Sequence, residues 1–221
     1  MTQVEVAPVV KRNSLLKRNP SLSRVEFSKH YEFHHGPLAA SQAGFRQFAL
    51  RYVQNHVEDL PNGEDPLFDG VTMSTQVPRD NYSVGFFTHP DYGNVKEDEQ
   101  YLFDIPRTVS VLGVETVEAA HEKSQFKALL LTFDGGIAAS DFDAVTRVVL
   151  NNLDVTTASA LGFHSGKFEY NRLLELWFED ESARTRAFEL VDSREADVLN
   201  PIFLPVREVL IYGPEKPWRG A

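Results

Sequence analysis

Three histidines lie within six residues, at His30, His34 and His35, directly before Gly36-Pro37. Histidine accepts and donates protons near neutral pH, so this cluster could serve acid–base chemistry. Proline disfavours helical geometry in the residue before it, so we expect a helix to end at Gly36-Pro37 and to fix His35 there. The alternative is that the histidines only complement the dipole at a helix C-terminus.

A second group of polar side chains is expected on one strand. Tyr52, Gln54 and His56 alternate and would project from one face. Phe48 and Leu50 would lie on the same face if no bulge intervenes. An apolar patch that runs into a few polar groups is typical of a ligand cavity. The other interpretation is a polar row on an exposed strand edge.

A third candidate is His89, which precedes Pro90 and lies near Tyr92 and Asp98. Its backbone is expected to be extended. The acidic run at residues 97–99 is interpreted as a solvated helix face.

Several site classes have no sequence support. The chain has no phosphate-binding glycine loop and no GxSxG elbow. His30 and His34 have the spacing of a metal-binding helix, but a third ligand is not evident, so we expect no metal and no cofactor. Haem held by one histidine stays as a minor alternative.

Composition narrows the partners and the compartment. The net charge of −10 disfavours nucleic acid and anionic membranes. The absence of cysteine excludes disulfides and thiolate sites. With no signal peptide or apolar span in the sequence, we expect a cytoplasmic protein.

The elements that would carry the first candidates follow the order β-α-β-β-α-β. Strands are expected at residues 13–18, 45–58, 68–77 and 107–117, and helical regions at 23–36 and 79–103. Ser23 and Glu26 have the spacing of a capping box. Val53 and Val57, on the other face of the long strand, are expected to meet the helices.

The same order is expected again after a polar linker at residues 116–125. Strands are expected at residues 126–133, 156–165, 170–180 and 203–213, and helices at 140–150 and 181–193. The chain is therefore interpreted as an α+β protein of two fused ferredoxin-like units, residues 12–117 and 126–214. Packed sheet against sheet, they would form a pseudo-dimeric barrel that encloses a cavity. A single larger α+β domain is the competing interpretation.

Residues 12–115 resemble the EthD family of the dimeric α+β barrel superfamily. The resemblance rests on KRNPSLSRVEFSKHYEFHHGPLA, YVQNHV, FDGV and HPDYGNVKEDEQYLFD, and HYxxxHGPL at residues 30–38 is its most specific part. Relatives include fungal polyketide dehydratases or decarboxylases, so the resemblance implies cofactor-free proton transfer in a barrel cavity, on an aromatic or polyketide-type small molecule.

The residues proposed for that chemistry combine both lines of reasoning. The catalytic candidates are His35 or His56 as base, Tyr52 as proton donor and His89 as second acid. The substrate-binding candidates are Tyr31, Phe48, Leu50, Gln54 and Tyr92, with Gln54 holding a carbonyl. His164 or Tyr170 of the second unit could reach in.

The expected function is a lyase or cyclase, by dehydration, decarboxylation or aldol cyclisation. The alternatives are a non-catalytic barrel that binds a hydrophobic metabolite or serves in stress response, and a cofactor-free or haem oxygenase. A chain with two fused units would be a monomeric pseudo-dimer, and a homodimer stays open.

Overall fold

The computed structural model describes residues 8–160, 168–194 and 200–219. Its strands are β1 Val10–Leu16, β2 Ala49–Val57, β3 Gly70–Gln76, β4 Val109–Ala120, β5 Phe126–Thr132, β6 Val145–Asp154, β7 Arg172–Phe178 and β8 Ile202–Tyr212. They close into an antiparallel barrel in the order β1-β3-β2-β8-β5-β7-β6-β4. The fold is therefore α+β, as expected.

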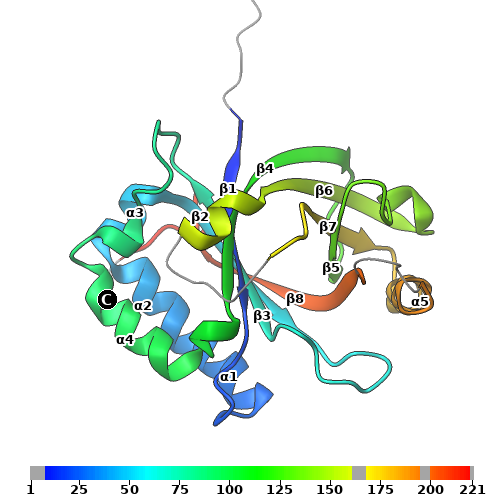
Figure 1. The fold of residues 1–221 in the computed structure, drawn as a ribbon, viewed down its shortest axis with the longest axis horizontal. Helices are drawn as coiled ribbons and strands as arrows, with labels where there is room; N and C mark the ends of the chain where they lie inside the picture. The colour runs from blue at the N-terminus through cyan, green and yellow to red at the C-terminus, as the bar shows by residue number, and fades with distance from the viewer. Residues whose placement is uncertain (1–7, 161–167, 195–199, 220–221) are drawn as a thin grey trace, which may run out of the picture.

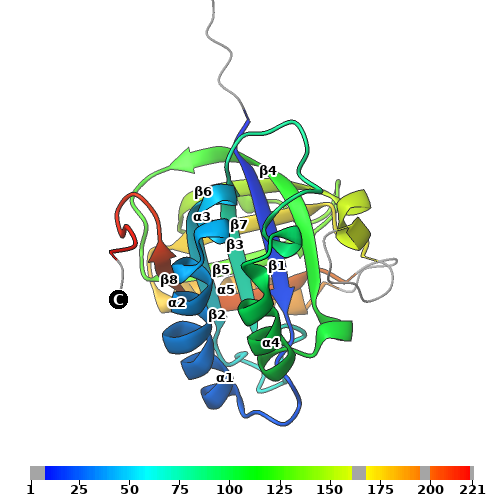
Figure 2. The ribbon, with the colours of Figure 1, turned by 90° about the vertical axis from the view of Figure 1, so that its left-hand side faces the viewer.

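The helices lie outside the barrel. They are α1 Arg24–His30, α2 Gly36–Ser41, α3 Ala43–Phe48, α4 Tyr92–Leu102 and α5 Glu181–Asp192, with a π-helical segment η1 Tyr31–His35 and short 3₁₀ turns η2 Phe86–Thr88, η3 Ile105–Arg107, η4 Ala139–Asp141 and η5 Val155–Ala160. Helices α1 to α4 gather on one side and α5 on the other (Figure 1). Viewed from their own side, they cover β1, β2 and β3 (Figure 2). None of the described helices is long and apolar enough to cross a membrane.

The two halves of the barrel have the same relative strand order, β4-β1-β3-β2 and β8-β5-β7-β6. They differ in their helices. The helix expected at residues 140–150 is wrong, because only the short η4 forms before β6 begins at Val145. The run TRVVL is rich in β-branched residues, which favour a strand. Among the described elements, α5 is therefore the only α-helix of the second half.

Three further expectations fail at element boundaries. Residues 45–48 belong to α3, so β2 begins at Ala49 rather than at 45. The linker expected at 116–125 is wrong in its first half, because β4 continues to Ala120 and pairs with β6. The strand expected at 156–165 is η5 in its first part, and β7 pairs with β6 instead. His164 lies outside the described residues.

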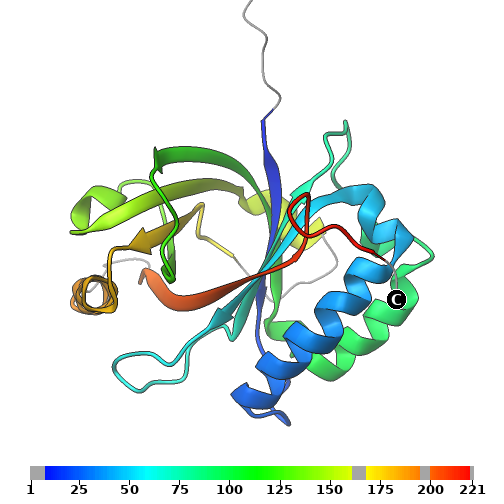
Figure 3. The same ribbon diagram turned by 180° about the vertical axis from the view of Figure 1, so that it is seen from behind.

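The expected capping box forms: Glu26 N–H donates to Ser23 Oγ, and Ser23 N–H donates to Glu26 Oε2 at 2.8 Å. The expected stop at Gly36-Pro37 is wrong. The chain passes through η1 into α2, and α1, η1 and α2 form one continuous helical run (Figure 3). Gly36 N–H donates to the Tyr31 carbonyl, the i→i−5 bond of a π-helix. Gly36 has no Cβ to clash with Pro37, so it stays helical.

The two faces of β2 are oriented opposite to expectation. Val57 packs in the core cluster inside the barrel with Leu129 and Leu204. Tyr52 packs outside it, with residues of α2 and α4. Both faces of the strand are buried, so polarity could not show which one meets the helices.

The barrel interior is filled by side chains. Its apolar part includes Leu15, Met73 and Leu173. Buried charged side chains lie on the same strand faces. Lys127 Nζ donates to Glu175 Oε2 at 2.7 Å. Lys11 Nζ donates to the other oxygen of that carboxylate at 2.6 Å. The expected site inside the barrel is therefore wrong: the cavity that His35 and Tyr52 line lies outside the barrel, under the helices.

Candidate active site

A cavity lies between the outer face of β1, β2 and β3 and the helices that cover it. Its empty space is about 640 Å³, including its mouth. Five phenylalanines line it, which suits a flat apolar ligand. The lining residues are Arg12, Ser14, Leu16, His35, Ala39, Phe45, Phe48, Ala49, Tyr52, Thr72, Ser74, Gln76, Phe86, Phe87, Val95, Glu99 and Phe103.

His35 reaches this cavity because of the π-helical segment that it ends. The segment places His35 against the sheet, where it is 5% exposed. The helix can approach so closely because Gly36 has no side chain. A Cβ there would lie 2.8 Å from Gln54 Nε2 and 3.1 Å from Ile211 Cδ1. A local π-turn at a candidate catalytic residue is a recurrent feature of functional sites.

Asp98 of α4 stands behind His35. His35 Nδ1 donates to Asp98 Oδ2 at 2.8 Å. This bond holds the proton on Nδ1 and leaves Nε2 as the acceptor. Nε2 has no hydrogen-bond partner among the described residues, and the ring lines the cavity. The pair has the arrangement of a base and its orienting carboxylate.

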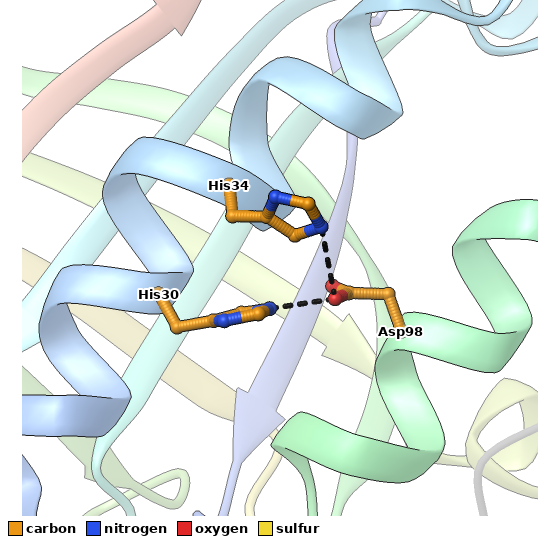
Figure 4. A group of neighbouring side chains, drawn as sticks. All are labelled: His30, His34 and Asp98. Carbon is orange, nitrogen blue, oxygen red and sulfur yellow. Dashed lines mark hydrogen bonds and ion pairs between the residues drawn. The ribbon is translucent and has the colours of Figure 1, made fainter.

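The same carboxylate meets the other two histidines on its far side (Figure 4). His30 Nε2 lies 2.6 Å from Asp98 Oδ1, and His34 Nε2 lies 3.5 Å from it. Burial raises the pKa of Asp98, but its bonds to His35 and His30 outweigh this and leave the pKa lowered. Asp98 is therefore held ionised, and the expectation that residues 97–99 form a solvated face is wrong for this residue.

His30, His34 and Asp98 are also the residues that could hold a metal ion. One ligand atom of each lies within 4.8 Å of the others. Two imidazoles and a carboxylate suit a divalent first-row ion. This supplies the third ligand that was not evident in the sequence, while the expectation of no metal stays a prediction. His34 is largely exposed, so the group faces outward.

Glu99, next to Asp98 on α4, faces the cavity instead. It is 5% exposed, and burial raises its pKa to about 8, although the Tyr92 hydroxyl, which donates to Glu99 Oε2, opposes that shift. At neutral pH the carboxyl is therefore mostly protonated and can donate a proton. Glu99 Oε1 has no partner among the described residues.

Behind the cavity wall runs a chain of hydrogen bonds. Gln54 Nε2 donates to the Tyr31 carbonyl at 2.7 Å and to the Tyr52 hydroxyl at 2.9 Å. His56 Nε2 donates to Gln54 Oε1 at 3.2 Å, so its Nδ1 accepts from Ser28 Oγ at 2.8 Å. Burial, with Arg207 nearby, lowers the pKa of His56 to about 4 against the effect of Glu32. His56 is thus a neutral, fully bonded ring.

Only some of the site residues predicted from sequence line the cavity. His35, Tyr52 and Phe48 line the cavity. Burial raises the pKa of Tyr52, so its phenol stays protonated. Leu50 is 48% exposed, so its expected place on the binding face is wrong. The bulge between Ala49 and Arg51 separates it from the wall.

Tyr31, Tyr92 and His89 lie near the cavity without lining it, whereas Tyr170 lies in the second half. Tyr31 is buried, and its hydroxyl is 2.6 Å from Thr72 Oγ1. Tyr92 contacts the cavity residue Glu99, whereas His89 Nδ1 accepts the Asp91 backbone N–H at 3.2 Å. Tyr170 donates its hydroxyl to the Asn200 carbonyl in the second half.

Sequence reasoning missed Arg12, Glu99 and the orienting role of Asp98. In α4, the sequence signal that could have found Glu99 was the spacing of the buried residues. Val95, Glu99 and Leu102 recur every three or four residues and are buried together. Arg12 lies on β1 at the same parity as Ser14 and Leu16, the strand face toward the helices.

Residues 19–106 match the model of the EthD domain family. This confirms the resemblance over that range. No curated protein sequence gives a significant match to the chain. A solved structure described as a "putative monooxygenase" from Lactobacillus acidophilus NCFM has 8% identity and a TM-score of 0.47, covering 92% of this chain and 95% of its own. Another so described, from Fusobacterium nucleatum subsp. nucleatum, has 6% identity and a TM-score of 0.47, covering 93% and 94%.

Proposed function

We propose that this chain, whose residues 19–106 form an EthD domain, is a lyase or cyclase that acts on an aromatic or polyketide-type metabolite without a cofactor. The proposal rests on one observation: a proton acceptor and a proton donor line the same cavity. His35, oriented by Asp98, offers an acceptor nitrogen, and Glu99 offers a proton. A proton acceptor and a proton donor on one cavity are what general acid–base catalysis requires.

In a dehydration, His35 Nε2 takes the proton from the carbon next to a carbonyl. The C–O bond of the β-hydroxyl then breaks, and the oxygen leaves as water with the proton of Glu99. Tyr52, a protonated phenol on the same wall, donates to the carbonyl oxygen as negative charge develops there. Acid–base steps of this kind contribute about 10²–10⁴-fold each.

His56 and Gln54 take a supporting role in this proposal. Gln54 donates to the Tyr52 hydroxyl oxygen, so the Tyr52 proton can bond to Thr72, which also lines the cavity, or to a substrate carbonyl. His56 fixes the Gln54 amide through Oε1. Both are positioning residues, in place of the base and the carbonyl ligand expected from sequence.

We also propose that the barrel arose as two fused ferredoxin-like units with one site. The repeated strand order supports this, and the second half lacks a counterpart of the α1–α3 run among its described elements. A barrel closed within one chain would make the protein a monomer of 25.0 kDa. Light scattering after size exclusion tests this, and a mass of twice that value contradicts it.

The function is tested by incubating the purified protein with aromatic β-hydroxy ketones and β-keto acids and following the products by mass spectrometry. Loss of water or of carbon dioxide, absent in His35→Asn and retained in His121→Asn at an exposed histidine, supports the proposal. A panel bound without any turnover favours the metabolite-binding alternative. A haem absorption band in the purified protein favours the oxygenase.

A further inference from the structure

Among the residues that the structure describes, Arg12 is a buried cation without an acidic partner. It lies on β1, lines the cavity and is 7% exposed. Its one hydrogen bond within the described residues runs from Nη2 to the Tyr82 carbonyl at 3.5 Å, the limit for such a bond. Its Nη1 is buried and has no partner there. A guanidinium carries five donors, so most of its capacity is unused.

The other buried basic side chains of the described chain are all neutralised. Lys11 and Lys127 share Glu175, Lys17 meets Asp69, and Arg184 meets Glu58. Burial of an unpaired charge is costly, and proteins normally avoid it. Arg12 departs from that pattern beside a cavity in which a ligand could supply the missing charge.

The surroundings of Arg12 make the local charge more positive. A Cβ on Gly85 would lie 3.2 Å from Arg12 Nη2 and 3.5 Å from Arg79 Nη2, so both guanidinium groups approach the same backbone. Burial and then Arg79 lower the pKa of Arg12 to about 10, so it remains charged at neutral pH. Arg79 Nη2 donates to Gln76 Oε1 at 3.2 Å rather than to a carboxylate.

An aromatic surface adjoins the free donors. The Arg12 guanidinium carbon lies 4.8 Å from the centre of the Phe87 ring, within the range of a cation–π contact. Phe87 also lines the cavity. A planar ligand could therefore rest on aromatic rings while its anionic end meets the guanidinium.

We propose that Arg12 is the anchor for a carboxylate on the substrate, so that the site takes aromatic carboxylic acids. The guanidinium fork matches a carboxylate with two parallel hydrogen bonds. This deepens the proposed function by naming a substrate class, and it rests on that function for turnover but not for binding.

Binding of 2-naphthoic acid and of its neutral isostere 2-naphthamide, measured by titration calorimetry, tests the proposal. We expect the acid to bind at least about tenfold more tightly to the wild type, as charge-assisted bonds do. Arg12→Gln should abolish this preference, and Arg12→Lys should keep part of it. Arg194→Gln, at an exposed arginine paired with Asp141, should leave it unchanged.

A second readout separates an anchor from a structural residue. Removing an unpaired buried charge should raise the thermal midpoint of ligand-free Arg12→Met, whereas loss of a structural contact would lower it. Equal affinity of the wild type for acid and amide, or an acid preference retained in Arg12→Gln, overturns the proposal. Arg12-dependent binding without any turnover leaves it standing and contradicts only the proposed function.

Discussion

Asp98 joins two histidine groups through separate oxygens: Oδ2 accepts from His35 at 2.8 Å inside the cavity wall, and Oδ1 accepts from His30 at 2.6 Å outside it. The carboxylate is thereby fixed from both sides. The orientation of the His35 ring therefore depends on a residue that does not itself line the cavity.

Asp98→Asn should lower kcat by about 10²–10⁴-fold, because the amide no longer holds the proton on His35 Nδ1 as a carboxylate does. The KM should change less, since Asp98 does not line the cavity. The matched control is Glu97→Gln, one residue earlier on the same helix and exposed. Steady-state kinetics check this, and an unchanged kcat in Asp98→Asn would remove the dyad from the mechanism.

We expect turnover to fall above about pH 8, because Glu99 then loses the proton that it donates. Stability should fall at lower pH than turnover does, as the pH rises from about 5 to 8. The pKa of Glu99 is raised in the folded state, so the folded protein holds a proton that the unfolded chain has lost, and rising pH favours unfolding up to the folded pKa. In Glu99→Gln the decline in thermal midpoint between pH 5 and 8 should flatten. A decline of wild-type size in that variant contradicts the assignment.

For His56 we expect the opposite trend, a loss of stability as the pH falls. Its pKa is lowered to about 4 in the folded state, so the unfolded chain binds a proton first and stability falls as pH drops below the unfolded value. His56→Ala should remove that dependence and cost about 1–3 kcal/mol, because Gln54 Oε1 loses its donor. Its kcat should fall far less than that of His35→Asn. Urea unfolding at several pH values, with kinetics, tests both points, and a loss of kcat equal to that of His35→Asn would restore His56 as the base.

The structure explains why sequence reasoning located some of these residues and misread others. The two-residue alternation grouped Tyr52, Gln54 and His56 correctly on one face of β2. It placed that face in the barrel because polar residues suggested a cavity there. The barrel interior is itself polar at Lys127 and Glu175, and both faces of β2 are buried, so polarity could not distinguish the sides.

The predictions of a solvated face at residues 97–99 and of a helix end at Gly36-Pro37 were wrong for a different reason. Three adjacent acids on a helix point in different directions, and only tertiary contacts show that Asp98 and Glu99 face inward while Glu97 does not. At Gly36, local preference predicts a helix end. The π-turn overrides that preference, together with the hydrogen bond that Gln54 donates to the Tyr31 carbonyl.

Gly36→Ala tests that close approach directly. The added Cβ would meet Gln54 Nε2 at 2.8 Å and the Ile211 side chain, so we expect a loss of about 1–3 kcal/mol in unfolding free energy, as for other overpacked sites. Gly93→Ala in α4, where a Cβ meets nothing within 4 Å, should instead stabilise the protein by up to about 1 kcal/mol. Denaturant unfolding of both variants measures this, and equal stability of the two would contradict the packing described for η1.

The central claim is that His35 removes a proton from carbon. It is tested most directly by following, with NMR in deuterated water, the exchange of the proton next to the carbonyl of an aromatic β-hydroxy ketone that the protein binds. The wild type and His121→Asn should exchange this proton, and His35→Asn should not. Exchange at the wild-type rate in a folded His35→Asn protein would contradict the account.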